Sequence, residues 1–327
     1  MATPTAALPE VRKRPVAGHL SGGDGVARAL TLFFALLILV VTVLLVVQLW
    51  NNSELTRAKF GLGFLTSAVW NQNSTPSRPE EYGALPFIYG TCVTAFLALL
   101  ISVPLGVGAA IYLAELAPPK ISNGLTFMIE LLAAVPSVIF GLIAIFSVVP
   151  IMRTTVEPFI KKGLGFLPIF SGPTYGFGYL TAGLVLSIMT LPYIISVSRE
   201  AILSVPREQR EAALALGATQ WESTWDAVLP FAKLGIIGSV FLALARALGE
   251  TMAVTMVIGN DPKINTSLFS QGYTLASVIA NEFPEAVKLH SAALVELALV
   301  LFALTMAVNA MAQLMIVLTT QKGSGKG

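Results

Sequence analysis

Six long apolar segments constrain this chain more than any other feature of its sequence. They cover residues 28–50, 85–113, 124–152, 179–197, 234–258 and 291–319. A helix needs roughly 20 apolar residues to cross the hydrocarbon of a bilayer, which is about 30 Å thick. Only 12% of the residues are charged, whereas a soluble domain has about 25%. The sequence therefore predicts an all-α, polytopic bundle of six transmembrane helices in a cell membrane.

The apolar segments also divide the chain. Residues 1–84 are predicted to hold a disordered, basic N-terminal tail (1–23), the first span and an external stretch (51–84) with one short amphipathic helix around residues 60–70. Residues 85–320 form the main transmembrane domain, which includes a polar cytoplasmic loop at 199–233, and residues 321–327 form a Gly/Lys-rich tail. Lys and Arg in the loops weakly favour cytoplasmic N- and C-termini.

Composition excludes several classes of function. The net charge is +2, so no strong positive field is present to attract nucleic acid. The single cysteine, Cys92, and the two histidines, His19 and His290, lie far apart in the sequence. A metal site needs such residues in a cluster at short spacing. We therefore expect the chain to lie in a lipid bilayer and to bind neither nucleic acid nor a metal.

The polar loop at residues 199–233 contains clear helix boundaries. Pro206 is suited to a first helical turn, and Gly217 to a left-handed stop. Thr219 and Glu222 have the spacing of a capping box, which opens a second short helix that Pro230 follows. The loop is therefore predicted to be a helix, a tight glycine turn and another helix.

Trp221 and Trp225 are four residues apart in this loop, so they share one face of the second helix. Two interpretations are open at this point. The indoles insert into a groove of a partner protein, or they pack against the cytoplasmic ends of the spans. Spacing alone does not separate the two.

The same loop is similar to the EAA loop of ABC-importer permeases, with the pattern E-A-A-x3-G-x9-I-x-L-P. The matching residues are Glu211, Ala212, Ala213, Gly217, Leu229 and Pro230, and Ala227 stands where the pattern has isoleucine. The resemblance implies a coupling helix that docks on a separate ATP-hydrolysing subunit. It assigns the coupling role to Glu211, Ala212, Gly217, Leu229 and Pro230, with Trp221 and Trp225 on the second helix.

Arg246 is predicted to lie deep in the fifth span, about 18 Å from its cytoplasmic end. A cation at that depth costs from about 3 to more than 10 kcal/mol, so an anion must compensate it. Glu250 is predicted one turn further along the same helix face, and Glu130 and Glu296 lie in other spans. Either an ion pair fixes the helix packing, or Arg246 and Glu250 line a pathway for an oxyanion, which a guanidinium binds well.

Three segments resemble the PstC-type permease subunit of phosphate (Pst) ABC importers more closely than other permeases. They are residues 246–255, 104–113 and 134–142, and the resemblance extends over about residues 85–320. It implies a type I (MetI-like) importer architecture and transport of inorganic phosphate. It also implies as partners a PstA-type permease, two copies of a PstB-type ATPase and an extracytoplasmic PstS-type binding protein. ATP and Mg would be bound by the ATPase, with no cofactor and no enzyme activity in this chain.

Other functions remain open on the residues alone. One arginine and one glutamate do not distinguish phosphate from sulfate or molybdate, and an importer of an organic solute has the same loop. A membrane-embedded enzyme would need a nucleophile and acid–base groups at one membrane face, and the predicted spans contain no histidine cluster of that kind. An autonomous anion channel would not need a coupling loop.

Overall fold

The computed structural model describes residues 22–72 and 79–324. The chain divides into two units, residues 1–48 and 49–327. In the described residues, six helices are long and apolar enough to cross a membrane. They are Gly25–Asn52, Leu85–Leu116, Ser137–Leu164, Tyr179–Leu203, Gln220–Gly249 and Lys288–Leu318. The predicted tail at residues 1–21 lies outside the described residues, whereas residues 22 and 23 already belong to the first helix.

Helices make up most of the described chain. The α-helices are α1 (Gly22–Asn52), α2 (Glu54–Phe60), α3 (Gly63–Thr66), α4 (Leu85–Ile111), α5 (Pro119–Ala133), α6 (Ser137–Ile143), α7 (Val149–Ile151), α8 (Glu157–Leu164), α9 (Tyr179–Leu203), α10 (Arg207–Ala215), α11 (Gln220–Glu222), α12 (Leu229–Gly249), α13 (Met252–Ile258), α14 (Leu275–Glu282) and α15 (Lys288–Ser324). Short π-helical segments are η1 (Tyr112–Leu116), η2 (Ala144–Val148), η3 (Met152–Val156) and η5 (Ser223–Val228), and 3-10 turns are η4 (Pro168–Phe170) and η6 (Phe283–Glu285). Strands β1 (Trp70–Asn71) and β2 (Glu81–Tyr82) pair antiparallel.

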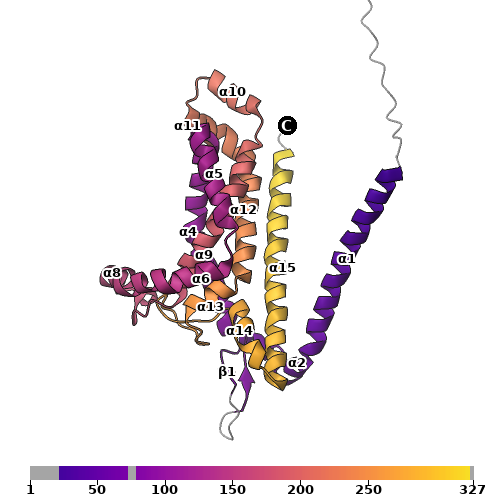
Figure 1. Ribbon diagram of the computed structural model, residues 1–327, viewed down its shortest axis with the longest axis vertical. Helices are drawn as coiled ribbons and strands as arrows, with labels where there is room; N and C mark the ends of the chain where they lie inside the picture. Colours follow the sequence, from indigo (N-terminus) through magenta and orange to yellow (C-terminus); the bar gives the residue numbers. More distant parts are fainter. Residues whose placement is uncertain (1–21, 73–78, 325–327) are drawn as a thin grey trace, which may run out of the picture. The chain divides into compact units, whose positions relative to one another are not determined.

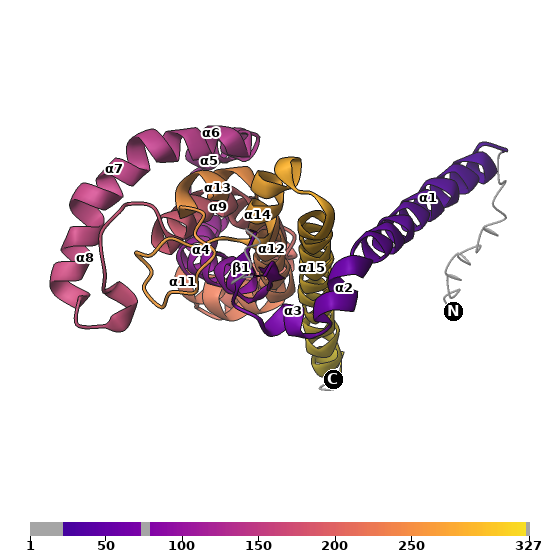
Figure 2. The same cartoon turned by 90° about the horizontal axis from the view of Figure 1, so that it is seen from below.

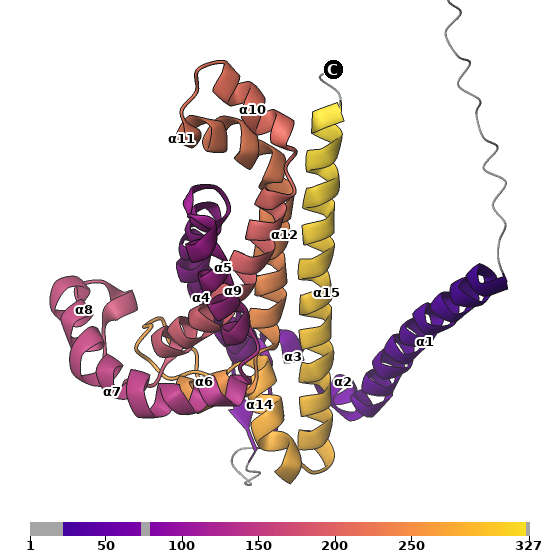
Figure 3. The same ribbon diagram turned by 45° about the horizontal axis from the view of Figure 1, so that its top comes forward.

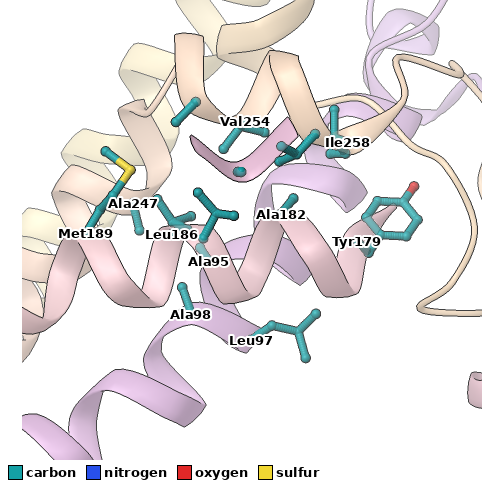
Figure 4. Close-up of a cluster of buried hydrophobic side chains, with 14 of the residues drawn as sticks. Ala95, Leu97, Ala98, Tyr179, Ala182, Leu186, Met189, Ala247, Val254 and Ile258 are labelled. Carbon is teal, nitrogen blue, oxygen red and sulfur yellow. The ribbon is translucent and has the colours of Figure 1, made fainter. Parts of the chain in front are cut away.

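Helix α9 is the centre of the second unit. In its most apolar stretch, 61% of the residues are buried, whereas the share is 22–33% in the other spans of this unit. It packs against α4, α12 and α13, and Figure 4 shows Leu186 and Ala182 facing Ala95 of α4. Gly183 allows this close approach, because a Cβ there would lie 2.6 Å from Cβ of Leu97. Small residues at such contacts are typical of helices packed in membranes.

The third span differs from the prediction of one helix over residues 124–152. Helix α5 ends at Ala133, and Pro136 has an extended backbone with ψ 139°. The chain then continues through α6, α7 and α8, which form a curved arm along one side of the second unit (Figures 1 and 2). The proline sets this break, since it cannot continue the hydrogen bonds of α5.

The fifth span is also displaced from the predicted residues 234–258. The helix is continuous from Gln220 to Gly249, and α13 is a separate helix. Glu250 between them is extended, with ψ 126°. Its Oε1 accepts a hydrogen bond from Ala253 N at 3.4 Å. Glu250 therefore caps α13 and does not lie one turn beyond Arg246 on the same helix face.

The stretch predicted to be external contains two short helices, and only the second, Gly63–Thr66, lies within the predicted residues 60–70. Gly61 adopts a φ of +53° and ends α2. After α3 the chain becomes extended and pairs Trp70 with Tyr82. Burial, with Glu80 and Glu282 nearby, raises the pKa of Tyr82 to about 12, so this phenol stays neutral at physiological pH. At the other end of the chain, α15 continues to Ser324, so the first part of the predicted tail is helical.

Candidate functional site

The predicted cytoplasmic loop forms one end of the second unit. Figures 1 and 3 place α10 and α11 at the end toward which the C-terminal end of α15 points, with α14 at the opposite end, and Figure 1 shows β1 there as well. Pro206 directly precedes α10, and Gly217 turns the chain with φ +90°. The capping box is present, because Thr219 Oγ1 accepts from Glu222 N while the Glu222 carboxylate accepts from Thr219 N at 2.8 Å. The predicted helix, glycine turn and helix start are confirmed.

The second helix of the loop does not end before Pro230. It continues through η5 into α12, and Pro230 lies in the first turn of α12. The π-helical turns of η5 shift the hydrogen-bonding register just before the proline, so the helix stays continuous although Pro230 has no N–H. Leu229 is half-buried and Pro230 exposed. Both residues are therefore part of a helix that reaches into the fifth span.

The two indoles of the loop lie together. The rings of Trp221 and Trp225 stack with centroids 5.8 Å apart, and the residues are 55% and 56% exposed. They line an apolar cavity of about 730 Å³ whose other walls include Pro104 of α4 and Ile236 of α12. The shared helix face is confirmed. The structure places the pair over the ends of the spans and leaves more than half of each residue accessible to a partner.

An ion pair that the sequence analysis missed fixes α10 to the end of the second span. Arg210 Nη2 lies 2.7 Å from Glu115 Oε1, and its Nε lies 3.1 Å from the same oxygen. Its Nη1 and Nη2 also donate to the carbonyls of Val205 and Ile202, at 2.6 and 2.8 Å. Side-chain exposure is only 21% for Arg210 and 12% for Glu115. Because 95 residues separate the two in sequence, no local pattern predicts this contact.

The matched acidic residue of the loop lies beside this pair. Glu211 and Ala212 are exposed on α10. Glu211, Glu115 and Arg210 line a cavity of about 410 Å³. The ion pair Arg210–Glu115 therefore holds the Glu211 side of α10 at a fixed position under the second span.

Arg246 lies in the last turn of α12. Its guanidinium carbon is 4.4 Å from the ring centroid of Tyr193 on α9. The buried Nε of Arg246 has no hydrogen-bond partner. Tyr193 in turn donates its hydroxyl to the carbonyl of Ala133 at 3.2 Å, at the end of α5. The cation is thus held by an aromatic face, which sequence analysis did not identify.

The predicted carboxylate partners of Arg246 lie elsewhere. Glu250 caps α13, Glu130 is exposed on α5, and Glu296 is buried in a cavity with Arg57 and Trp50. In the described part of the chain, no ion pair joins any of them to Arg246. The expected ion pair therefore does not form in this structure, because the helix ends at Gly249 and a ring occupies the guanidinium face.

Comparison with known proteins gives consistent matches over most of the chain. The sequence model of a family described as "Binding-protein-dependent transport system inner membrane component" matches residues 102–317. A protein of Mesorhizobium japonicum named "Phosphate transport system permease protein PstC" is 42% identical over 95% of both chains. A protein of the same name from Xylella fastidiosa is 43% identical over 84% of both chains. A probable phosphate transport system permease PstC of Methanocaldococcus jannaschii is 35% identical over 77% of this chain and 80% of its own.

Solved structures share the fold at low sequence identity. A chain of the MetNI methionine ABC transporter, in an inward-facing conformation, matches with a TM-score of 0.52 and 16% identity over 72% of this chain and 94% of its own. A chain of a bacterial ABC transporter involved in import of the acidic polysaccharide alginate also has a TM-score of 0.52 and 16% identity, over 89% and 97%. The predicted architecture of an ABC-importer permease is therefore confirmed.

Proposed function

The chain belongs to the family of inner membrane components of binding-protein-dependent transport systems, and from this premise we propose that it is the translocation subunit of an ATP-driven importer of inorganic phosphate. It is a multi-pass membrane protein and a permease subunit. Relatives named as phosphate transport permeases, at 42–43% identity, support the substrate.

The observation that carries the proposal is the state of Arg246. A guanidinium has five N–H donors and stays charged at any accessible pH. Here it rests on the Tyr193 ring, makes no ion pair in the described residues, and leaves its buried Nε unpartnered. A phosphate oxygen would supply the missing acceptors. Weak holding by a ring, rather than by a carboxylate, also lets the anion bind and leave without breaking an ion pair.

Partners are part of the same proposal. The chain pairs with a homologous PstA-type permease and with two copies of a PstB-type ATPase, which bind ATP and Mg, while a PstS-type protein delivers phosphate on the external side. Glu211, Ala212, Gly217, Trp221, Trp225, Leu229 and Pro230 form the surface that meets the ATPase. In this orientation the N- and C-termini are cytoplasmic, and no cofactor is bound by this chain.

The geometry suggests how ATP-driven movement reaches the substrate. Docking of the ATPase moves α10, which Arg210 and Glu115 tie to the second span. The same movement reaches Gln220, where the helix that carries Arg246 begins. Closure of the ATPases therefore changes the position of Arg246 relative to Tyr193 on α9. The position of the Arg246 guanidinium therefore differs between the outward-open and inward-open states.

Uptake by the assembled complex in sealed vesicles tests the function. We expect uptake of radiolabelled phosphate to require ATP and the external binding protein, and to persist in a large excess of sulfate or molybdate. Suppression of uptake by either competitor would assign the site to another oxyanion. Phosphate flux through this chain alone, without ATP, would instead make it a channel.

A further inference from the structure

A second polar site lies in an apolar groove near the opposite end of the second unit from the coupling loop. Figures 1 and 3 show α2 beside the start of α15, and the two helices pack together. A cavity of about 530 Å³ opens between them. Its lining includes Trp50, Arg57, Leu62, Glu296, Leu299 and Leu304. Apart from one cation and one carboxylate, the walls are apolar.

The carboxylate in this groove is not satisfied by the protein. Glu296 is only 7% exposed, and its Oε2 is buried without a hydrogen-bond partner. Burying an ionised carboxylate without a donor is strongly unfavourable, and nearly all buried polar atoms of proteins have a partner. Glu296 Oε2 can therefore accept a hydrogen bond from a group with N–H or O–H donors.

The cation is held at the mouth of the groove. The guanidinium carbon of Arg57 lies 3.6 Å from the ring centroid of Trp50. Its Nε donates to Ser53 Oγ at 3.2 Å, and its Nη2 to the carbonyl of Trp50. No ion pair joins Arg57 to Glu296 in the described residues. Tryptophan and arginine together at the end of a span are typical of the lipid headgroup level.

We propose that this groove binds a zwitterionic phospholipid with a primary amine, of the phosphatidylethanolamine type. The lipid phosphate lies at Arg57, and the ammonium donates to the free oxygen of Glu296. An acyl chain runs along the α15 face formed by Leu299, Val300, Ala303 and Leu304, whose spacing places them on one side of the helix. The occupant and the groove then match in charge, one positive and one negative group each.

The headgroup chemistry distinguishes this lipid from others. A choline headgroup has no N–H, so it cannot donate to Glu296. The headgroup of phosphatidylglycerol has O–H donors for Glu296 but no positive charge, so this lipid would bring a net negative charge beside the carboxylate. Only a headgroup with both a phosphate and a cationic N–H donor matches the two side chains in hydrogen bonding and in charge. Lipid binding in this groove is independent of what the protein transports.

Lipid retention by the whole complex tests the proposal. The complex is placed in nanodiscs of equal phosphatidylethanolamine, phosphatidylcholine and phosphatidylglycerol, extracted, and its retained lipids quantified by mass spectrometry. We expect enrichment of phosphatidylethanolamine over phosphatidylcholine by about tenfold, the size of one charged hydrogen bond. Glu296→Leu should abolish this preference, and Arg57→Gln should lower retention of all phospholipids.

Two matched variants on α2 serve as controls. Glu54→Leu and Lys59→Gln change an acidic and a basic residue of the same helix that do not line the groove, so both should retain the preference. Equal retention of the two zwitterionic lipids by the unaltered complex would overturn the proposal. So would a preference that survives Glu296→Leu, or a groove that retains no phospholipid because a protein segment covers it.

Discussion

Two arginines of the second unit are held in opposite ways. Arg210 on α10 uses three nitrogens in hydrogen bonds to a carboxylate and two carbonyls. Arg246, in the last turn of α12, rests on an aromatic ring, and its Nε has no partner. A guanidinium whose N–H donors are all bonded within its own chain holds two segments together. A guanidinium that contacts only a ring keeps its N–H donors for another molecule. Arg210 therefore fixes the loop to the second span, whereas Arg246 is a candidate ligand site.

The largest effect is expected at the unsaturated arginine. Arg246→Gln removes the charge that meets the anion, and losing one member of a buried charged contact costs about 2–5 kcal/mol, or at least about 30-fold. Phosphate uptake should fall by this factor or more, while the complex assembles normally because no ion pair within the described chain is lost. Arg246→Lys is the control and should keep part of the uptake. Normal uptake by Arg246→Gln would show that Arg246 does not bind the transported anion and does not differ from Arg210 in this respect.

A change of backbone in the loop should separate ATP hydrolysis from transport. Gly217 has φ +90°, and proline is locked near −65°, so Gly217→Pro should displace α10 from the start of the long helix. We expect phosphate transported per ATP hydrolysed to fall by about tenfold or more. Gly217→Ala should have a smaller effect, because a Cβ meets no atom within 4 Å and only the backbone conformation is strained. Unchanged transport per ATP in the proline variant would show that the loop does not couple the two.

The saturated arginine should give an intermediate effect. Glu115→Gln or Arg210→Gln leaves the other, largely buried charged side chain without its ion-pair partner. The loss destabilises the contact by about 1–3 kcal/mol. Transport per ATP should fall several-fold, and the two changes should not add in the double variant, since each removes the same contact. Additive losses in this cycle would mean that Arg210 and Glu115 act independently.

The smallest effect is expected at the ring that holds Arg246. Tyr193→Phe keeps the aromatic face and loses only the hydrogen bond to the Ala133 carbonyl, at about 1 kcal/mol. Tyr193→Leu also loses the cation–π contact, worth about 0.5–2 kcal/mol. The KM for phosphate should therefore rise more in the leucine variant than in the phenylalanine variant, with ATP hydrolysis preserved in both. Equal KM values would show that the ring does not position the guanidinium.

Features set by neighbouring residues were predictable from sequence. The capping box of Thr219 and Glu222 and the left-handed turn at Gly217 depend on a few consecutive residues, and both are present. Apolar length predicted the number of spans, and the matched motifs predicted the family, which the relatives confirm. The roles assigned to the matched residues remain predictions.

Features set by tertiary contacts were not predictable in the same way. The end of α12 at Gly249 coincides with the extended Glu250, whose carboxylate accepts from Ala253 N in the first turn of α13, and the apolar residues on both sides of this point did not indicate a break. The contacts of Arg246 with Tyr193 and of Arg210 with Glu115 join residues 53 and 95 positions apart. Of the short helix expected around residues 60–70, only Gly63–Thr66 forms a helix of its own, because Gly61 separates it from α2 and Trp70 pairs with Tyr82 in a strand.

Because the helix from Gln220 to Gly249 is continuous, a movement at its first turn also displaces its last turn. Trp221 and Arg246 are 25 positions apart on it, or about 38 Å at the rise of an α-helix. A tilt of about 5° around the Trp221 end of the helix would move the guanidinium sideways by about 3 Å over that length. This displacement is about one hydrogen-bond length, so an anion within reach of Arg246 in one orientation of the helix would lose its hydrogen bonds in the other.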